Sequence, residues 1–237
     1  MRRGLIWAGL VLSLAVAGGA AWMFAIGWAP SRATYAVQGI DVSEANGAID
    51  WTAMKAQEVD FAYARATAGV GTRDASFAAN WAGMTEAGVR RGAIHVFSLC
   101  GSAAEQADAF VTTVPRDPAA LPAAIDLSFH EDCPARPARE GVLGAPPPPR
   151  AGEGWQEEAG GRAAVIETHS DKPVILRVSP EFEAQYRVSE AIPRSLWSTG
   201  NFRTPDYFAR PWRMWQSSTI RRIEGLEPAV NWNVVAP

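Results

Sequence analysis

The sequence predicts an α/β fold, an irregular TIM-like (β/α) barrel preceded by an N-terminal transmembrane or signal-anchor helix. Three observations predict it. The 237 residues are 48% hydrophobic and 20% charged, a composition that supports one large buried core. Short apolar runs alternate with amphipathic patterns, as in parallel βαβ units. The first apolar run is long enough to cross a bilayer.

The N-terminal segment is the first element. Residues 4–31 carry no charged side chain, and Arg2 and Arg3 precede them. Because about 20 apolar residues span a bilayer, the run Leu5–Trp28 is long enough to do so. The two arginines favour a cytoplasmic N-terminus. We therefore expect residues 4–28 to contact the membrane.

A cleaved signal peptide is the alternative, because the small residues 17–21 are suitable for cleavage. We expect residues 1–31 to be a signal anchor or a signal peptide, and residues 36–237 to form the barrel. In both cases the barrel is exported. It is either anchored in the inner membrane, facing the periplasm or the cell exterior, or it is secreted.

The strand candidates are short apolar runs bounded by turn residues. The first contains Asp41 at its end, and the second is followed by a turn that contains Gly69 and Gly71. The eight candidates are residues 35–42, 61–66, 92–97, 123–127, 174–178, 196–198, 214–216 and 230–234. Because little helical sequence separates the last three, we expect the barrel to be irregular.

The helix candidates repeat apolar residues at intervals of three and four. Asp50 is placed to cap the first of them. Phe77, Trp81 and Met84 lie on one face of the second, and Gly88 is placed to end it. The candidates are residues 51–57, 77–88, 103–114, 163–169 and 182–188.

One stretch interrupts this alternation where a helix is expected. Residues 144–162 contain four consecutive prolines, Pro146–Pro149, and several glycines. Proline cannot continue a helix and favours an extended polyproline conformation. We expect a flexible surface insertion here, with a short helix after it.

The two cysteines, Cys100 and Cys133, follow the third and fourth strand candidates. Consecutive strands of a barrel are neighbours, so the two loops should meet. An exported protein folds in an oxidising compartment, where such a pair forms a disulfide. A bond would place the two Cα atoms roughly 4.4–6.8 Å apart. Two unrelated buried thiols are the alternative.

Candidate functional residues lie at the strand ends, because the active sites of (β/α) barrels form at the carboxyl ends of the strands. Asp41 and Asp126 each end a strand candidate. Basic and amide side chains occupy comparable positions: Arg65, His95, Asn231 and Asn233. A carboxylate pair at such a mouth is typical of glycoside hydrolysis. The alternatives are an Asp41 that caps a turn and a His95 that is a hydrogen-bonded interior histidine.

Three tryptophans near the ends of the late strands have the flat faces that suit stacking on sugar rings: Trp197, Trp215 and Trp232. We count Trp197 and Trp215, with the neighbouring Gln216, among the candidate substrate-binding residues. The charge balance argues against a nucleic-acid partner. With a net charge of -3 and no basic cluster, the chain does not resemble a nucleic-acid binder, and we expect no metal and no cofactor.

The order of motifs resembles the lysozymes of glycoside hydrolase family 25. Similar segments occur along residues 39–235, apart from the insertion. They are GIDVSEANGAIDW, VDFAYARATAG, FAANWAGMTEAGVRRGAIHVF, AEQADAF, PVILRVSPEF, LWSTGNF, WRMWQSS and IEGLEPAVNWNVV. The resemblance implies a barrel that cleaves peptidoglycan glycan strands after N-acetylmuramic acid. It also implies an Asp-x-Glu pair at the fourth strand, supported by an Asp in the first strand and another in the last.

The catalytic set departs from that pattern. Asp41 matches the first-strand Asp, and Asp126 matches the first member of Asp-x-Glu. Ser128 stands where the general acid is expected, Asn231 replaces the last Asp, and Ala68 stands where many members have Glu. Residues two apart in a strand share a face, so Ser128 points where the acid should. Its hydroxyl is too weak an acid for that role.

Three hypotheses remain. The first is a muramidase with a rearranged catalytic set, in which Asp41 and Asp126 stabilise charge and Glu131 or Asp132 supplies the proton. The second is a catalytically impaired barrel that lacks the general acid and binds peptidoglycan or a partner through the same cleft; Glu131 and Asp132 then belong to a solvated loop. The third is a glycosidase of another specificity. General acid catalysis contributes about 10²–10⁴-fold, so a zymogram against purified peptidoglycan separates the first two.

Overall fold

Nine strands form a single sheet that closes on itself in the computed structural model, which describes residues 2–143 and 160–237. Eight of them make the barrel, because β1 pairs with both β9 and β2; β3 is a short addition to β2. The strands are β1 (Gln38–Val42), β2 (Phe61–Ala68), β3 (Thr72–Arg73), β4 (Arg90–Val96), β5 (Ala124–Leu127), β6 (Ile175–Val178), β7 (Ser195–Thr199), β8 (Met214–Ile223) and β9 (Leu226–Val235). The predicted irregular barrel is confirmed.

The irregularity lies in the last two strands. β1, β2 and β4 to β8 run parallel, whereas β9 is antiparallel to both β8 and β1. Only two residues separate β8 from β9, and Gly225 in that turn has a φ of 81°. Such a short connection permits only a hairpin. The two strands of this hairpin pair along most of their length, and both are longer than the short runs 214–216 and 230–234 that the sequence predicted.

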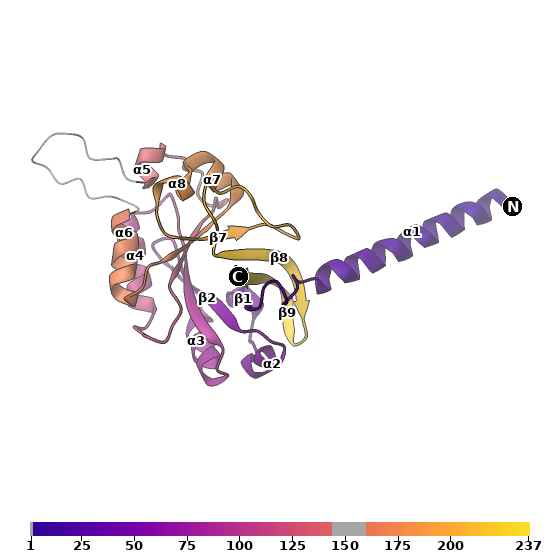
Figure 1. Cartoon of the computed structure of the whole chain (residues 1–237), viewed down its shortest axis with the longest axis horizontal. Helices are drawn as coiled ribbons and strands as arrows, with labels where there is room; N and C mark the ends of the chain where they lie inside the picture. The colour runs from indigo at the N-terminus through magenta and orange to yellow at the C-terminus, as the bar shows by residue number, and fades with distance from the viewer. Residues whose placement is uncertain (1, 144–159) are drawn as a thin grey trace, which may run out of the picture.

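Helices cover the outside of the barrel, as Figure 1 shows. Asp50 accepts a hydrogen bond from the Ala53 backbone NH, which confirms the predicted cap. The helix predicted at 182–188 ends at Tyr186, because Arg187 adopts a left-handed φ of 52°. The helices are α2 (Trp51–Ala56), α3 (Phe77–Glu86), α4 (Ala103–Thr113), α5 (Arg139–Leu143), α6 (Gly160–Ser170), α7 (Pro180–Tyr186) and α8 (Val188–Ala191), with a 3₁₀ turn η1 (Glu44–Asn46).

The predicted insertion at 144–162 falls mostly outside the described residues. The short helix expected after it corresponds to α6, which begins three residues earlier than residue 163.

The interior of the barrel contains a cluster of apolar side chains. Alternate strand residues point inward, and the inward set packs into one cluster: Phe61, Tyr63, Ile94, Ala124, Ile175, Trp197 and Met214. The other strand face packs against the helices. Because both faces of most barrel strands are buried, hydrophobic alternation in the sequence does not reveal which side chains point inward.

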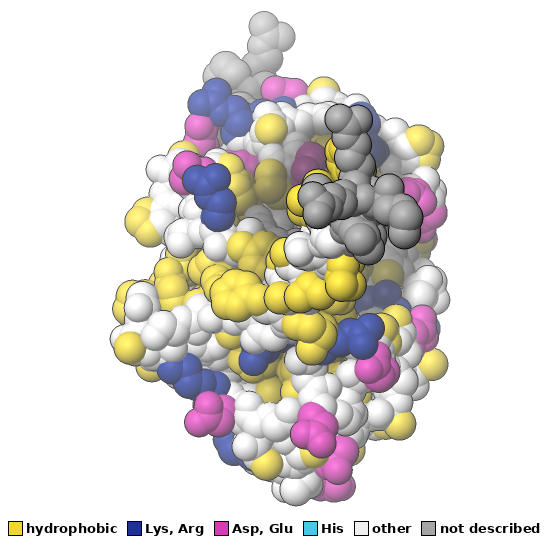
Figure 2. Space-filling model, turned by 90° about the vertical axis from the view of Figure 1, so that its right-hand side faces the viewer, with side chains coloured by type: hydrophobic (Ala, Val, Ile, Leu, Met, Phe, Trp, Pro, Cys, Tyr) yellow, Lys and Arg dark blue, Asp and Glu magenta, His cyan; other side chains and the backbone are white. Residues whose placement is uncertain are grey.

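The apolar helix α1 (Arg2–Gly27) projects away from the barrel (Figure 1). Its segment Gly9–Gly27 is long and apolar enough to cross a membrane, with a mean hydropathy of 2.0. Residues 9–24 are exposed, and Ile26 in the last turn is buried against the barrel. Figure 2 views the molecule from this side and shows the hydrophobic side chains gathered across the face. The helix is consistent with a signal sequence or an anchor.

Candidate active site

A cleft of about 760 Å³ opens at the mouth of the barrel. Its walls come from β1, β2, β4, β5 and β9 and from the loops that follow the first four of these strands. Asp41, Arg65, Asp126 and Asn231 line it, as the strand positions predicted. Arg177 of β6 lies among them, and the sequence analysis had not selected it.

Arg177 joins the two predicted carboxylates. Its Nη1 donates to Asp41 Oδ1 at 2.8 Å, and its Nη2 donates to Asp126 Oδ2 at 2.6 Å. The pairing of β5 with β6 places Asp126 directly beside Arg177. Burial opposes the charge of Arg177, but the charges of Asp126 and Asp41 and the hydrogen bonds to them outweigh burial and raise its pKa. One cation therefore holds both acids.

The amides of β9 occupy the remaining side of Asp41. Asn231 Nδ2 donates to Asp41 Oδ1, and Asn233 Nδ2 donates to Asp41 Oδ2, each at 2.8 Å. Asn233 Oδ1 accepts a hydrogen bond of 3.1 Å from Trp197 Nε1. The amides were expected at a carboxyl strand end. They reach the mouth instead because β9 runs antiparallel and places Asn231 opposite Asp41.

Ser128 completes the contacts of Asp126. Its hydroxyl donates to Asp126 Oδ1 at 2.6 Å, so the two side chains lie on the same side. Both oxygens of Asp126 thus accept a hydrogen bond, one from Ser128 and one from Arg177. Ser128, where the resemblance implies a general acid, therefore has a hydroxyl that donates to the neighbouring carboxylate.

Arg65 belongs to a second charged group at the rim. Its Nε donates to Asp74 Oδ2 at 2.8 Å, and its Nη2 donates to Glu44 Oε1 at 3.0 Å. Asp74 also accepts from the backbone NH groups of Glu44 and Ser76. This group ties β2 to η1 and to the turn before α3, so Arg65 holds the rim in shape.

The predicted disulfide is confirmed. Cys100 and Cys133 are bonded, with their Cα atoms 5.7 Å apart. The bond ties together the loops after β4 and β5, on one side of the cleft. Asp132 lines the cleft, whereas Glu131 is exposed and is not among the lining residues. The sequence analysis also missed His130, which lines the cleft and whose buried Nε2 has no hydrogen-bond partner among the described residues.

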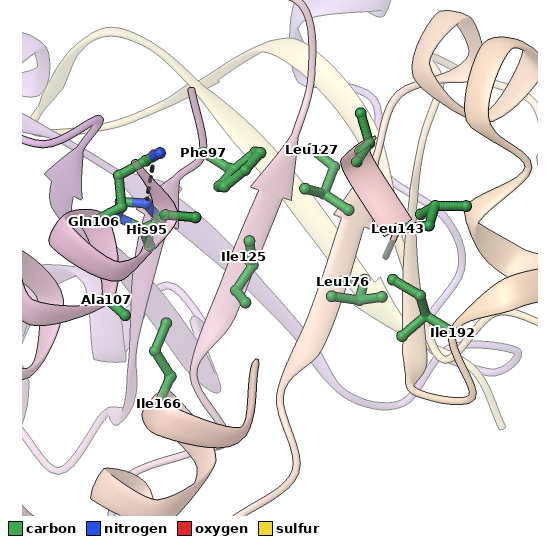
Figure 3. A pocket seen from close by; sticks show the side chains of 12 residues that line it. His95, Phe97, Gln106, Ala107, Ile125, Leu127, Leu143, Ile166, Leu176 and Ile192 are labelled. Carbon is green, nitrogen blue, oxygen red and sulfur yellow. Dashed lines mark hydrogen bonds between the residues drawn. The ribbon is translucent and has the colours of Figure 1, made fainter. Parts of the chain in front are cut away.

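The expected position of His95 at the mouth is wrong. His95 points outward from β4 and lines an internal cavity of about 40 Å³ between the barrel and its helices (Figure 3). Its Nδ1 lies 2.8 Å from Thr67 Oγ1, and its Nε2 lies 3.1 Å from Gln106 Oε1. Burial lowers the pKa of His95 to about 4, although Gln106 and Asp126 oppose this. His95 is the hydrogen-bonded interior histidine that was the alternative.

The tryptophans are not available for stacking on a ligand. Trp197 is fully buried inside the barrel, with the Arg177 guanidinium 5.2 Å from its ring centre. Trp215 points outward, where its Nε1 donates to the Gly200 carbonyl, and Trp232 is buried with its Nε1 on Gln38. Gln216 is buried and does not line the cleft. Among the described lining residues, His130 carries the one aromatic ring.

No cluster of three or more His, Cys, Asp and Glu side chains suited to a metal ion occurs in the two described ranges.

Comparison with known proteins agrees with this barrel. The model of the glycosyl hydrolases family 25 matches residues 40–226. The chain belongs to glycosyl hydrolase family 25. A solved family 25 glycosyl hydrolase from Bacillus anthracis superposes with a TM-score of 0.74 and 29% identity, over 88% of this chain and 92% of that one.

Sequence relatives fall in the same family region. The uncharacterized protein YegX of Escherichia coli is 28% identical over 209 residues, which are 85% of this chain and 70% of YegX. Lysozyme M1 of Streptomyces globisporus is 39% identical over 101 residues, which are 41% of this chain and 34% of that lysozyme. Within this family 25 barrel, the contacts of Arg177 and Ser128 set the chemistry of the mouth.

Proposed function

We propose that the mouth of this family 25 barrel binds the glycan strand of peptidoglycan without cleaving it efficiently. One observation carries the proposal: Arg177 donates to Asp41 and Asp126 at the same time. Both oxygens of each carboxylate already accept hydrogen bonds from neighbouring side chains. Neither acid is placed to give a proton to a glycosidic oxygen, as a general acid must.

The missing glutamate supports the same proposal. Ser128 donates to Asp126 rather than presenting an acidic proton to the cleft. Loss of a general acid typically removes about 10²–10⁴-fold of rate. The cleft itself remains open and polar, with a volume of about 760 Å³. A glycan strand, whose many hydroxyl and amide groups need hydrogen-bond partners, is the ligand that family membership favours.

Cleavage after N-acetylmuramic acid is the second candidate, and one observation favours it. Asp132 lines the cleft, on a loop tied down by the disulfide through the adjacent Cys133. In this case Asp132 supplies the proton that the missing glutamate would have given, while Asp126 stabilises positive charge. Exposed Glu131 does not line the cleft, so it serves as the matched control.

Two assays on the full chain in detergent separate the candidates. Co-sedimentation with purified peptidoglycan measures binding, and release of reducing ends measures cleavage. For a binding barrel we expect sedimentation without release. Ala68→Trp, which fills the cleft, should weaken binding at least tenfold, whereas Ala104→Trp on the exposed face of α4 should not.

The outcomes are distinct. Release of reducing ends at the rate of an active muramidase would overturn the binding proposal. If Asp132→Asn then abolished release and Glu131→Gln did not, the second candidate would be supported. Binding that is unchanged in Ala68→Trp would place the ligand outside the cleft and overturn both.

We also infer that residues 1–31 anchor the chain and that the barrel unit, residues 36–237, lies outside the cytoplasm. The exposed apolar helix and the Cys100–Cys133 disulfide support this inference. An anchored chain stays with membranes after a carbonate wash. A soluble form that begins near residue 21 or 22 would instead identify a cleaved signal peptide.

A further inference from the structure

We propose that the barrel surface next to the end of α1 docks on the lipid headgroup layer, in addition to the anchor itself. This surface, here called the collar, consists of Trp28 and the exposed loop residues 201–204. The proposal rests on the inference that α1 stays in the membrane. It goes beyond it because it assigns a second lipid contact to the folded barrel.

The end of α1 is held against the barrel by direct contacts. Arg221 Nη1 donates to the carbonyl of Gly27, the last residue of α1, at 2.5 Å. Ile26 is only 9% exposed. The segment that follows is held as well, because Gln38 Nε2 donates to the carbonyls of Pro30 and Tyr35. The barrel therefore cannot move away from the end of the helix as it could on a flexible linker.

The length of α1 sets the depth of the collar. The apolar segment Gly9–Gly27 has 19 residues, which span about 28 Å of helix, close to the ~30 Å hydrocarbon core of a bilayer. Trp28 then lies at the interface, where tryptophan is enriched in membrane proteins. The ring of Phe202 is 5.2 Å from the ring of Trp28, so Phe202 lies at the same depth.

The loop that carries Phe202 is held in place with its ring outward. Phe202 is 40% exposed and has a φ of 64°, a conformation that bulky residues rarely adopt. Its backbone NH donates to the Ser217 carbonyl, and Asn201 Nδ2 donates to Thr219 Oγ1 at 3.0 Å. A positive φ at a bulky residue persists only where the surrounding contacts stabilise it, and such backbone conformations are found at functional positions.

A lipid surface is the occupant that this geometry favours. The collar follows directly on the exposed apolar side chains of α1, because Trp28 is the residue after the end of that helix. Exposed Arg203 follows Phe202; an arginine beside an aromatic ring at headgroup depth meets lipid phosphates. A protein bound on the collar would have to share it with the bilayer that surrounds the adjacent helix.

Spin labels on the full chain in phosphatidylethanolamine–phosphatidylglycerol vesicles test this. The chain has two cysteines, which are bonded to each other, so one introduced cysteine is a unique labelling site. Labels at Arg203→Cys in the collar, Leu12→Cys in α1 and Asp108→Cys on α4 report depth. The measured quantity is the accessibility of each label to oxygen relative to a water-soluble nickel complex.

We expect the Leu12→Cys label in the hydrocarbon core, the Asp108→Cys label in water, and the Arg203→Cys label at headgroup depth. Its oxygen-to-nickel ratio should exceed that of the Asp108→Cys label several-fold. If positions 203 and 108 were equally aqueous while position 12 lay in the core, the collar would be refuted and the anchor retained. If position 12 were also aqueous, both inferences would fall.

Discussion

Replacing Arg177 with methionine tests whether the central cation is part of the framework of the barrel. Arg177→Met keeps much of the length and the apolar stem of the side chain but removes the group between Asp41 and Asp126. The side chains of the two acids are 8% and 5% exposed. They would remain close together and buried without a cation.

The contacts of Arg177 allow an estimate of the loss. Two hydrogen bonds between charged groups disappear, each worth about 1.5–3 kcal/mol. Removing one partner of a buried ion pair typically costs about 3–5 kcal/mol, because an uncompensated charge remains. We therefore expect the free energy of unfolding to fall by about 3–5 kcal/mol. For a chain of this size that lowers Tm by roughly 6–20 °C.

Thermal unfolding of the full chain in detergent measures the effect. Arg177→Lys keeps the charge but not the forked donors, so its loss should be smaller. Arg116→Met, at an exposed arginine, should stay within about 0.5 kcal/mol of wild type. If Arg177→Met were as stable as Arg116→Met, the guanidinium of Arg177 would not stabilise the two buried carboxylates, and the proposed role of their contacts with it would be refuted.

The remaining predictions use the same contacts. Ser128→Glu alone should give little muramidase activity, because Arg177 would pair with the new carboxylate. The double variant Ser128→Glu, Arg177→Met should release reducing ends faster than Ser128→Glu alone, by up to ~10²–10⁴-fold. Equal activity of the two variants would contradict this reasoning. The pKa of His95 is about 4 when folded, against an ordinary 6.5, so the unfolded chain binds its proton first as the pH falls. Urea unfolding should show about 3 kcal/mol lost between pH 7 and pH 4, and His95→Gln should abolish this part of the pH dependence. Reducing the Cys100–Cys133 bond, which spans 33 residues, should cost about 3–4 kcal/mol; a Tm unchanged by reductant would refute this.

Local chemistry carried several predictions directly from sequence to structure. Asp50 caps its helix because an aspartate at the N-cap accepts a hydrogen bond from a backbone NH of the first turn, an interaction that depends only on the local sequence. The disulfide followed from two cysteines after consecutive strands of a barrel, and its Cα separation of 5.7 Å falls in the expected range. Ser128 lies one residue beyond β5, yet its side chain is on the same side as Asp126, as a spacing of two residues predicts for an extended chain. Each of these needs only neighbours in sequence or in strand order.

Arg177 marks what sequence reasoning could have found and did not. A charged residue within the apolar run PVILRVS must be paired when it is buried, and that alone signals a partner across the barrel. The identity of the partners is a different matter. Asp126 lies beside it through strand pairing, whereas Asp41 lies 136 residues away along the chain and meets it across the interior.

The sequence by itself determined the alternation of strands and helices, the disulfide, the apolar helix and the serine at position 128, where the family resemblance implies an acid. The tertiary structure alone decided which side chains enter the mouth. Helices cover one face of each strand and the interior fills the other, so His95 and Ile94 are both buried and the sequence does not distinguish inward from outward. The tertiary structure also decided that β9 runs antiparallel to β1, which brings Asn231 next to Asp41. Strand direction and barrel closure are set by contacts between distant segments, and only these decide where each side chain points.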